Sequence, residues 1–373
     1  MKTKKVLALL LALCMVFSLA ACSSSSSTED TETADTTTEE TADAEEAEAD
    51  SDITYETVTL TATTSYNENE SGGTQFQYFA DYLSDLTDGA ITVDITFGGT
   101  VASASEELTF LSDGSVDIAC IQTPVYSDLL PLMQFSSWCL EGISEALDFY
   151  NYVGFDNEAS AELIQQEAAD NNVIYLAFTA GGPNVWLSTQ SLESIDDLVG
   201  LKFGTSGSTT VYEQLGLSAV SCQVSDTYES LSRGVIDAVV MAFTPTVSMK
   251  WYEAATNYLF VGTYACGNPF TVNLDTWNSL SEDAQNALIE AAEATSAYSI
   301  ELQEELLEEY LTTVEETGCT VNYMADEETA TLYATYYEVN SESCMDRAAD
   351  LGIEDNMQVV LDAVADYYAD YLN

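Results

Sequence analysis

The stretch SEDAQNALIEAAEATSAYSIELQEELLEEYLTTVEETG, residues 281–318, carries the strongest structural signal in the chain. Ser281 is followed by two acids, which the helix dipole favours in a first turn. No helix-breaking residue follows before Gly318. The pattern therefore predicts a helix of about 36 residues, roughly 54 Å at 1.5 Å per residue. Because that length exceeds the diameter of one lobe, we interpret the helix as a spine shared by two lobes. A coiled coil is the rival interpretation, but the Glu-rich stretch 302–309 lacks a sustained a/d stripe.

Upstream of this helix, short apolar strands alternate with stretches of helical spacing. Apolar patterns predict strands over residues 58–62, 91–97, 116–121 and 173–178. Helical spacing predicts a helix over residues 76–86, and a capping box at residues 103–106 starts another that runs to Leu111. This alternation predicts an α/β body with largely parallel strand pairing.

The charge balance excludes several classes of protein. The chain has 64 acidic residues against 7 basic residues, no histidine and a net charge of -57. Without histidine it can build neither a Ser-His-Asp or Cys-His catalytic set nor a His-ligated metal site. A nucleic-acid binder is excluded too, because its affinity comes from Lys and Arg on phosphates.

The N-terminus is typical of an exported bacterial lipoprotein. Three lysines in Met1–Lys5 precede the apolar run Val6–Ala21, which is too short for a permanent membrane helix. Leu19-Ala20-Ala21-Cys22 resembles a lipoprotein box, which predicts a signal peptide over residues 1–21 and lipidation of Cys22. An ordinary signal peptide with a chance cysteine is the alternative. Residues 22–52 are acidic and lack aromatic side chains, which predicts a disordered tether to the outer face of the cytoplasmic membrane.

The other cysteines of the mature chain form no CxxC pair, which argues against a zinc cluster. Export permits disulfides, but the spacings identify no pairing, so we interpret most of these residues as small buried side chains. They are Cys120, Cys139, Cys222, Cys266, Cys319 and Cys344. The sequence predicts no metal site, no cofactor and no catalytic residue.

Two blocks of sequence resemble a known family. The first runs from Gly99 to Leu140 and contains Leu111-Ser112-Asp113-Gly114-Ser115-Val116-Asp117. The second contains Ile195-Asp196-Asp197-Leu198-Val199-Gly200-Leu201-Lys202-Phe203, then Leu215-Gly216, then the run from Tyr228 to Asp237. Together with the stretch Val272–Leu280, these motifs resemble the DctP-type extracytoplasmic solute receptors of tripartite ATP-independent periplasmic (TRAP) transporters.

The resemblance implies a two-lobed fold like that of periplasmic binding proteins, with a hinge and a solute held between the lobes. It also implies delivery of the solute to TRAP-type membrane subunits, with no enzymatic activity. Gly114 and Gly234 allow tight turns before buried strands, and we expect Asp117 and Asp237 to accept N–H groups from the preceding turn.

The predicted organisation has two lobes after the tether. Lobe I covers residues 53–180 with a return segment near 268–300, and lobe II covers residues 181–267. The spanning helix covers residues 281–317, and residues 318–373 form a strand and helices that pack on the lobes.

This chain departs from the family at the positions that clamp a solute carboxylate. Gly204 stands where the family has an arginine, Asn184 stands where members often have another, and Val239–Ala242 replaces a segment that contains asparagine. A buried carboxylate without a paired cation is costly, so we predict a neutral or cationic solute rather than an anion.

The predicted cleft residues follow the ends of strands, where α/β folds bind ligands. We expect stacking on Trp186 or Phe243 and hydrogen bonds from Gln122 and Asn184. The full predicted set is Tyr66, Asn67, Gln122, Tyr126, Asn184, Trp186, Gly204, Ser206, Met241 and Phe243.

Two other functions remain open from the residues. A substrate-binding lipoprotein of an ABC transporter shares the anchor, the two lobes and the cleft. A secreted hydrolase with paired carboxylates is the other candidate, although pairs arise by chance among 64 acids.

Overall fold

The computed structural model describes residues 54–140, 142–264 and 268–369. The described residues from Glu56 onward form one compact unit. The predicted signal peptide, Cys22, the tether and Cys266 lie outside the described residues. Within the described ranges, no helix is both long and apolar enough to span a bilayer.

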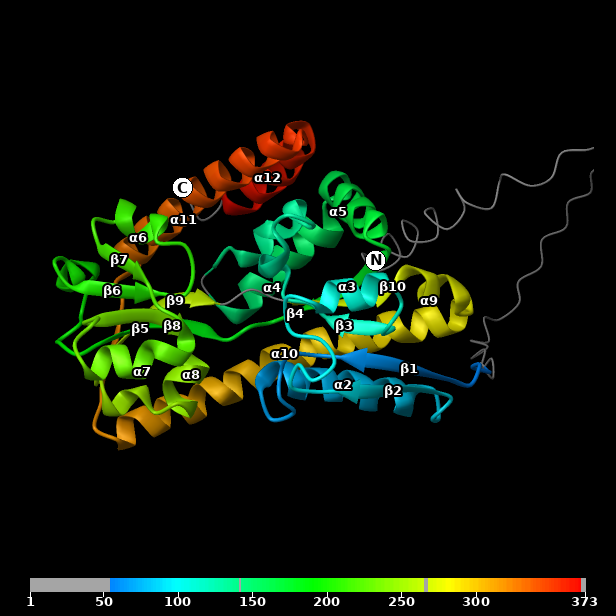
Figure 1. Cartoon of the computed structure of the whole chain (residues 1–373), viewed down its shortest axis with the longest axis horizontal. Helices are drawn as coiled ribbons and strands as arrows, with labels where there is room; N and C mark the ends of the chain where they lie inside the picture. The colour runs from blue at the N-terminus through cyan, green and yellow to red at the C-terminus, as the bar shows by residue number, and fades with distance from the viewer. Residues whose placement is uncertain (1–53, 141, 265–267, 370–373) are drawn as a thin grey trace, which may run out of the picture. The chain divides into compact units, whose positions relative to one another are not determined.

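The first of two β-sheets has the strand order β2-β1-β3-β10-β4 (Figure 1). Its strands are β1 Val58–Thr63, β2 Ile91–Thr96, β3 Ile118–Cys120, β4 Val173–Thr179 and β10 Asn268–Asn273. β1 pairs parallel with β2 and β3, whereas β10 runs antiparallel to β3 and β4. The elements that pack around it are α2 Ser71–Leu86, α3 Glu107–Ser112, η1 Thr123–Tyr126, η2 Pro131–Ser137, α4 Ile143–Asn151, η3 Tyr152–Asp156, α5 Glu158–Asp170 and α9 Leu274–Ser279.

The second sheet has the strand order β11-β9-β5-β8-β6-β7. Its strands are β5 Pro183–Ser188, β6 Lys202–Thr205, β7 Ser218–Ser221, β8 Ala238–Ala242, β9 Asn257–Tyr264 and β11 Thr320–Tyr323. β5 runs antiparallel to β8 and β9, and the other pairings are parallel. The helical elements of this part are η4 Ile195–Leu198, α6 Thr210–Gln214, α7 Val224–Ser232, α8 Phe243–Ser248 and η5 Trp251–Glu253.

Both sheets are mixed, which corrects the expectation of largely parallel pairing. The chain leaves the first sheet after β4 to form β5, and after β9 it forms β10 in the first sheet. β4 pairs with β10, and β5 pairs with β9. Because the outward and return paths run side by side, the strands beside the two crossings point in opposite directions.

The long helix is α10, Glu282–Glu316, with 35 residues. Ser281 caps it, since its side chain accepts a hydrogen bond from the N–H of Ala284 at 3.3 Å. α10 packs against α2 and β4 of the first sheet and against α8 of the second (Figure 1). Near its C-terminal end, Val314 lies in a core cluster of the second sheet. The prediction of a helix that spans both lobes is therefore confirmed.

A second helix, α11 Asp326–Leu351, also contacts both parts and lies in the region 318–373, for which we predicted helices that pack on the lobes. Leu332 lies in a core cluster with Trp186 on one face of the second sheet. Further along α11, Cys344 and Ala348 lie in the large core of the first sheet. That core also holds α12, Glu354–Tyr368. The two sheets are therefore linked by two crossing strand paths and by two helices.

The repeated Gly-x-Val/Ile-Asp motif has a structural role in both parts. Gly114 and Gly234 have φ values of 76° and 67°, which glycine adopts without strain. Asp117 Oδ2 accepts the N–H of Thr61 at 2.8 Å, and Asp237 Oδ2 accepts the N–H of Lys202 at 3.0 Å. Each aspartate thus accepts a backbone N–H from the strand that runs parallel beside it, whereas we expected an N–H of the preceding turn.

Candidate functional site

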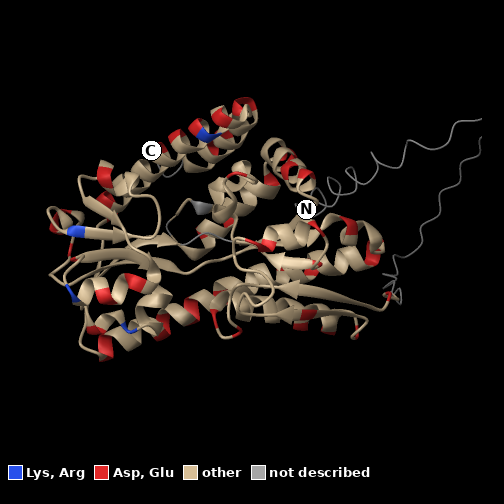
Figure 2. Cartoon of the chain, viewed as in Figure 1, with Lys and Arg blue, Asp and Glu red and all other residues tan. Residues whose placement is uncertain are grey.

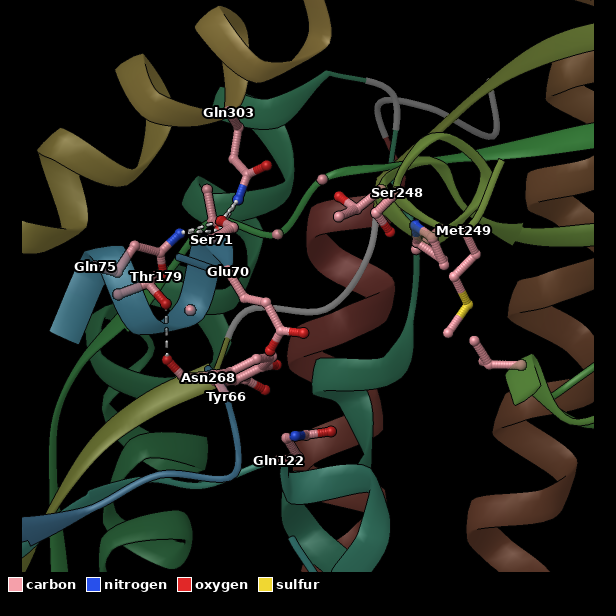
Figure 3. Close-up of a pocket in the computed structure, with 18 residues that line it drawn as sticks. Tyr66, Glu70, Ser71, Gln75, Gln122, Thr179, Ser248, Met249, Asn268 and Gln303 are labelled. Atoms are coloured by element: carbon pink, nitrogen blue, oxygen red, sulfur yellow. Dashed lines mark hydrogen bonds between the residues drawn. The ribbon is translucent and has the colours of Figure 1, made fainter. Parts of the chain in front are cut away.

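A pocket of about 370 Å³ lies between the two sheets (Figure 3). Its lining comes from the ends of β1, β3 and β4, the first turns of α2, the start of β10, α10, and the β8–α8 region. The lining residues are Tyr66, Glu70, Ser71, Gly72, Gln75, Gln122, Thr179, Ala180, Gly181, Gly182, Val224, Ala242, Thr244, Pro245, Ser248, Met249, Asn268 and Gln303. Strand ends at a crevice are where α/β folds bind ligands.

One wall of the pocket is tied together by two glutamines. Gln75 of α2 donates through Nε2 to the carbonyl oxygen of Ala180 at 3.1 Å and to Ser71 Oγ at 3.3 Å. Gln303 of α10 donates through Nε2 to the same two oxygens. The N–H of Ala180 donates to Ser299 Oγ at 2.7 Å. These bonds join α2, α10 and the segment that leaves β4.

Tyr66 reaches the pocket because glycine follows at the start of α2. A Cβ atom on Gly72 would lie 2.4 Å from Tyr66 Cδ2, so only glycine leaves room for the ring. Asn268 Nδ2 donates to the Tyr66 hydroxyl at 2.9 Å (Figure 3). The ring is therefore held between the first turn of α2 and the start of β10.

The wall from the second sheet is built differently. It consists of Val224 of α7 and of Ala242, Thr244, Pro245, Ser248 and Met249 around α8. These side chains include no carboxamide and no charged group, and Met249 is 49% exposed. This wall offers apolar surface and hydroxyl groups.

The described lining contains one acidic side chain, Glu70, and no lysine or arginine. Acidic side chains are spread over the helices of both parts (Figure 2). Two of the bases are paired elsewhere, because Arg233 contacts Glu229 at 3.2 Å and Arg347 contacts Asp128. Lys202 and Lys250 are exposed and do not line the pocket. The pocket therefore offers no cation to a solute carboxylate.

A buried carboxyl group lies behind the pocket wall. Glu107 is 0% exposed, and its Oε1 accepts the N–H of Ser65, next to Tyr66. Its Oε2 is buried without a hydrogen-bond partner among the described residues. Burial raises the pKa of Glu107 to about 7, although the hydrogen bond from Ser65 opposes the shift. Ser65 Oγ in turn accepts from Gln122 Nε2 at 3.1 Å, so Glu107 is linked through Ser65 to one lining side chain, Gln122.

Of the predicted cleft residues, the structure brings Tyr66 and Gln122 into the pocket lining. Asn67 is exposed beside it and donates to the Glu70 carboxylate through its backbone N–H at 2.8 Å and Nδ2 at 3.2 Å. Asn184 Nδ2 lies 3.8 Å from Cys139 Sγ, and Ser206 Oγ lies 3.2 Å from Met241 Sδ. None of Asn67, Asn184 and Ser206 belongs to the described lining.

The remaining predicted residues lie in packed cores, which corrects their expected place in an open cleft. Trp186 is 0% exposed and packs against Phe203 and Tyr212, and Phe243 is 1% exposed against Tyr258 and Phe260. Met241 and Tyr126 are buried as well. The Tyr126 hydroxyl accepts from the N–H of Leu108 and donates to the carbonyl oxygen of Ala104. Both faces of β5 and β8 are covered, so a residue near a strand end there need not reach the pocket.

Gly204 also lies inside the second sheet. A Cβ atom at this position would lie 2.9 Å from Ile236 Cδ1 and 3.1 Å from Cys222 Cβ. A larger side chain at residue 204 would therefore force these neighbours to move. Gly204 is absent from the described lining.

Sequence reasoning missed several lining residues. Ser71 and Gly72 form the small-residue start of α2, a signal that was readable but unused. Asn268 and Gln303 carry no local signal, because they reach the pocket only after β10 and α10 return to the first sheet. Four of the five described cysteines are buried, as predicted for most of them, and Cys319 is partly exposed.

Comparison with known proteins agrees with the fold. A solute-binding protein of Sulfitobacter sp. (strain NAS-14.1) is 25% identical over 232 residues, which cover 60% of this chain and 68% of that protein. A TRAP periplasmic solute binding protein from Rhodobacter sphaeroides, in an apo open structure, has a TM-score of 0.70 at 20% identity and covers 84% of this chain and 98% of its own. One from Roseobacter denitrificans with bound β-D-glucuronate has a TM-score of 0.64 at 18% identity and covers 82% and 99%.

The family predicted from the motifs is confirmed. Residues 62–344 match the DctP family, described as bacterial extracellular solute-binding protein, family 7. Members of this family bind solutes outside the cytoplasm and are not enzymes. The match covers most of the chain and both sheets, and so the protein belongs to the DctP family of bacterial extracellular solute-binding proteins.

Proposed function

We propose that the protein captures a small neutral or cationic solute in the pocket between its sheets and delivers it to TRAP-type membrane subunits. The observation that carries the choice of solute is the lining itself, which contains Glu70 but no lysine or arginine. A carboxylate buried there would lose its hydration without gaining a cation, at a cost of several kcal/mol. The net charge of -57 would also slow the approach of an anion.

This proposal separates the chain from relatives that bind sugar acids. The Roseobacter denitrificans protein holds β-D-glucuronate, a carboxylate. In this chain, Asn184 and Gly204 occupy the positions that the family pattern gives to cationic side chains. The four bases retained after Met1–Lys5 lie outside the pocket lining.

The capture step is a closure of two lobes, which we assign to residues 53–180 with 268–300 and to residues 181–267. The crossing strands pair as β4–β10 and β5–β9, so a bend between the pairs would move one sheet toward the other. Hinge closure around a ligand is common in two-lobed binding proteins. Closure would bring the Met249 wall toward Tyr66 and Gln303, and residues 281–317 and 318–373 would hold the two lobes together.

Membrane attachment through lipidated Cys22 completes the proposed arrangement, with residues 22–52 as the tether. The Leu-Ala-Ala-Cys sequence at residues 19–22 supports it. Expression of Cys22→Ala in a bacterial host is expected to release the protein from the membrane fraction. A Cys22→Ala protein that still fractionates with membranes and carries lipid mass would contradict the anchor.

The solute class is tested by thermal shift with compounds grouped by charge. Neutral sugars and nucleosides form the uncharged group, and amines form the cationic group. Pyroglutamate, D-glucuronate and D-galacturonate form the anionic group. We expect the melting temperature to rise with neutral or cationic compounds, because a ligand that binds only the folded state stabilises it. Stabilisation by carboxylates alone would overturn the proposed solute class.

A further inference from the structure

The carboxamide groups of the pocket wall use their N–H groups in hydrogen bonds within the protein. Gln75 and Gln303 both use their Nε2 groups on the carbonyl oxygen of Ala180, at 3.1 Å and 3.3 Å. A carbonyl oxygen can only accept, so these contacts fix which end of each carboxamide is the donor. The donors are therefore used inside the wall, and the Oε1 atoms remain as acceptors.

Two further carboxamides show the same arrangement. Gln122 Nε2 donates to Ser65 Oγ at 3.1 Å, and Asn268 Nδ2 donates to the Tyr66 hydroxyl at 2.9 Å. Asn268 Oδ1 is buried without a hydrogen-bond partner in the described part of the chain. Gln122 and Asn268 thus each engage one N–H group within the protein, whereas Gln75 and Gln303 each engage two, and the carboxamide oxygens remain as acceptors.

Glu70 adds a charged acceptor to this set. Figure 3 shows its side chain extending from the start of α2 into the space between the walls. Its carboxylate accepts from the backbone N–H and Nδ2 of Asn67, at 2.8 Å and 3.2 Å. A carboxylate has about four acceptor positions, so these contacts leave room for a donor from the solute.

The N–H groups of the first turn of α2 offer the rival chemistry, since a helix N-terminus attracts anions. Here Glu70 directly precedes that turn and makes no side-chain cap hydrogen bond to it. A solute carboxylate at the same place would lie beside the Glu70 carboxylate in a lining without a base. Repulsion between the two charges opposes anion binding there.

We infer that the pocket selects a solute that carries a protonated amine, and that Glu70 is the residue that binds the ammonium group. The carboxamide oxygens accept the remaining N–H or O–H groups of the solute, and the Tyr66 ring offers an aromatic face beside Glu70. This inference rests on the proposed function of the pocket. It narrows the solute from neutral or cationic to cationic.

The test measures binding by calorimetry with matched compounds. D-glucosamine and D-glucose form one matched pair, and agmatine, choline and putrescine extend the amines. Glu70→Gln removes the charge and keeps the size of the side chain. Glu68→Gln is the control, because Glu68 is exposed two positions away and does not line the pocket.

We expect one or more of the amines to bind, and Glu70→Gln to weaken that binding about tenfold to a hundredfold, as for a lost hydrogen bond to a charged group. Glu68→Gln should leave the affinity within about twofold, because Glu68 does not line the pocket and its charge lies farther from the solute. If only uncharged compounds bind, or if amines bind wild type and Glu70→Gln with equal affinity, the inference is overturned but the solute-binding function stands. Binding of only carboxylates would overturn both.

Discussion

The two walls of the pocket differ in how firmly they are held. The wall from the first sheet is interlocked, because Gln75 and Gln303 share the acceptors Ala180 and Ser71 across three elements. The wall from the second sheet rests on the short helix α8 and ends in Met249, which is 49% exposed. The difference indicates that the first wall determines which solute fits, whereas the second closes over it.

The largest expected effect comes from the carboxyl group behind the first wall. The pKa of Glu107 is about 7 in the folded protein, above its value in an unfolded chain. Between about pH 4.5 and pH 7, Glu107 therefore keeps a proton in the folded state that it loses in the unfolded chain. The resulting stabilisation is complete below about pH 4.5 and is lost as the pH rises through about 7.

Glu107→Gln removes this titration. Relative to wild type, the free energy of unfolding of the variant should rise by up to about 3 kcal/mol between pH 4.5 and pH 8. Urea denaturation at several pH values measures the difference. If the free energies of unfolding of the two proteins differ by a constant amount from pH 5 to pH 8, Glu107 does not titrate in this way.

The next effect concerns the packing that places Tyr66 in the first wall. In Gly72→Ala, the new Cβ atom would lie 2.4 Å from the Tyr66 ring, so the ring must leave its position. We expect solute affinity to fall about tenfold, with little change in stability because alanine favours the helix by about 1 kcal/mol.

Gly207→Ala is the matched control for this change. Its Cβ atom would lie 3.7 Å from Thr205 Oγ1, an ordinary contact. Titration calorimetry on both variants gives the comparison. Equal affinities would mean that Tyr66 is not part of the recognition surface.

A smaller effect is expected in the core on the Trp186 face of the second sheet. Trp186 is fully buried, and its Nε1 has no hydrogen-bond partner among the described residues. Trp186→Phe therefore removes volume but no hydrogen bond, and should lower the free energy of unfolding by about 1 kcal/mol. Solute affinity should stay unchanged, whereas a tenfold loss in a stably folded variant would mean that the indole contacts the solute.

The smallest effect is expected at the second wall itself. Met249→Ala removes an exposed, flexible and apolar side chain. We expect the solute affinity measured by calorimetry to change less than about threefold. A loss as large as that of Gly72→Ala would remove the distinction between the two walls.

Sequence patterns predicted the elements whose signals are local. Ser281 and Gly318 bound α10 because a cap and a glycine act on adjacent turns. At Ser103 only half of the predicted capping box forms: the Ser103 N–H donates to Glu106 Oε2 at 3.1 Å, but α3 begins at Glu107, with Glu106 as its N-cap residue. Of the residues predicted from strand ends, Tyr66 and Gln122 line the pocket, and their role in binding stays a prediction.

The rest of the site depends on contacts that no local pattern contains. Gln303 lies among glutamates on a long helix, and it becomes a wall residue only because α10 packs against α2. Trp186 and Phe243 were expected in the cleft, but both faces of the second sheet are covered, and α11 supplies part of that cover. When a strand is buried on both faces, the spacing of its apolar residues does not show which face contacts a ligand.

The most direct test of the account is a crystal structure of the protein with the tightest-binding compound of the charge-grouped screen. The account predicts the compound between the sheets, with its donor groups on Glu70 and on the oxygens of Gln75, Gln303 or Gln122, and with Met249 moved toward Tyr66. A compound bound outside this pocket, or one held through a carboxylate on the first turn of α2, would contradict it.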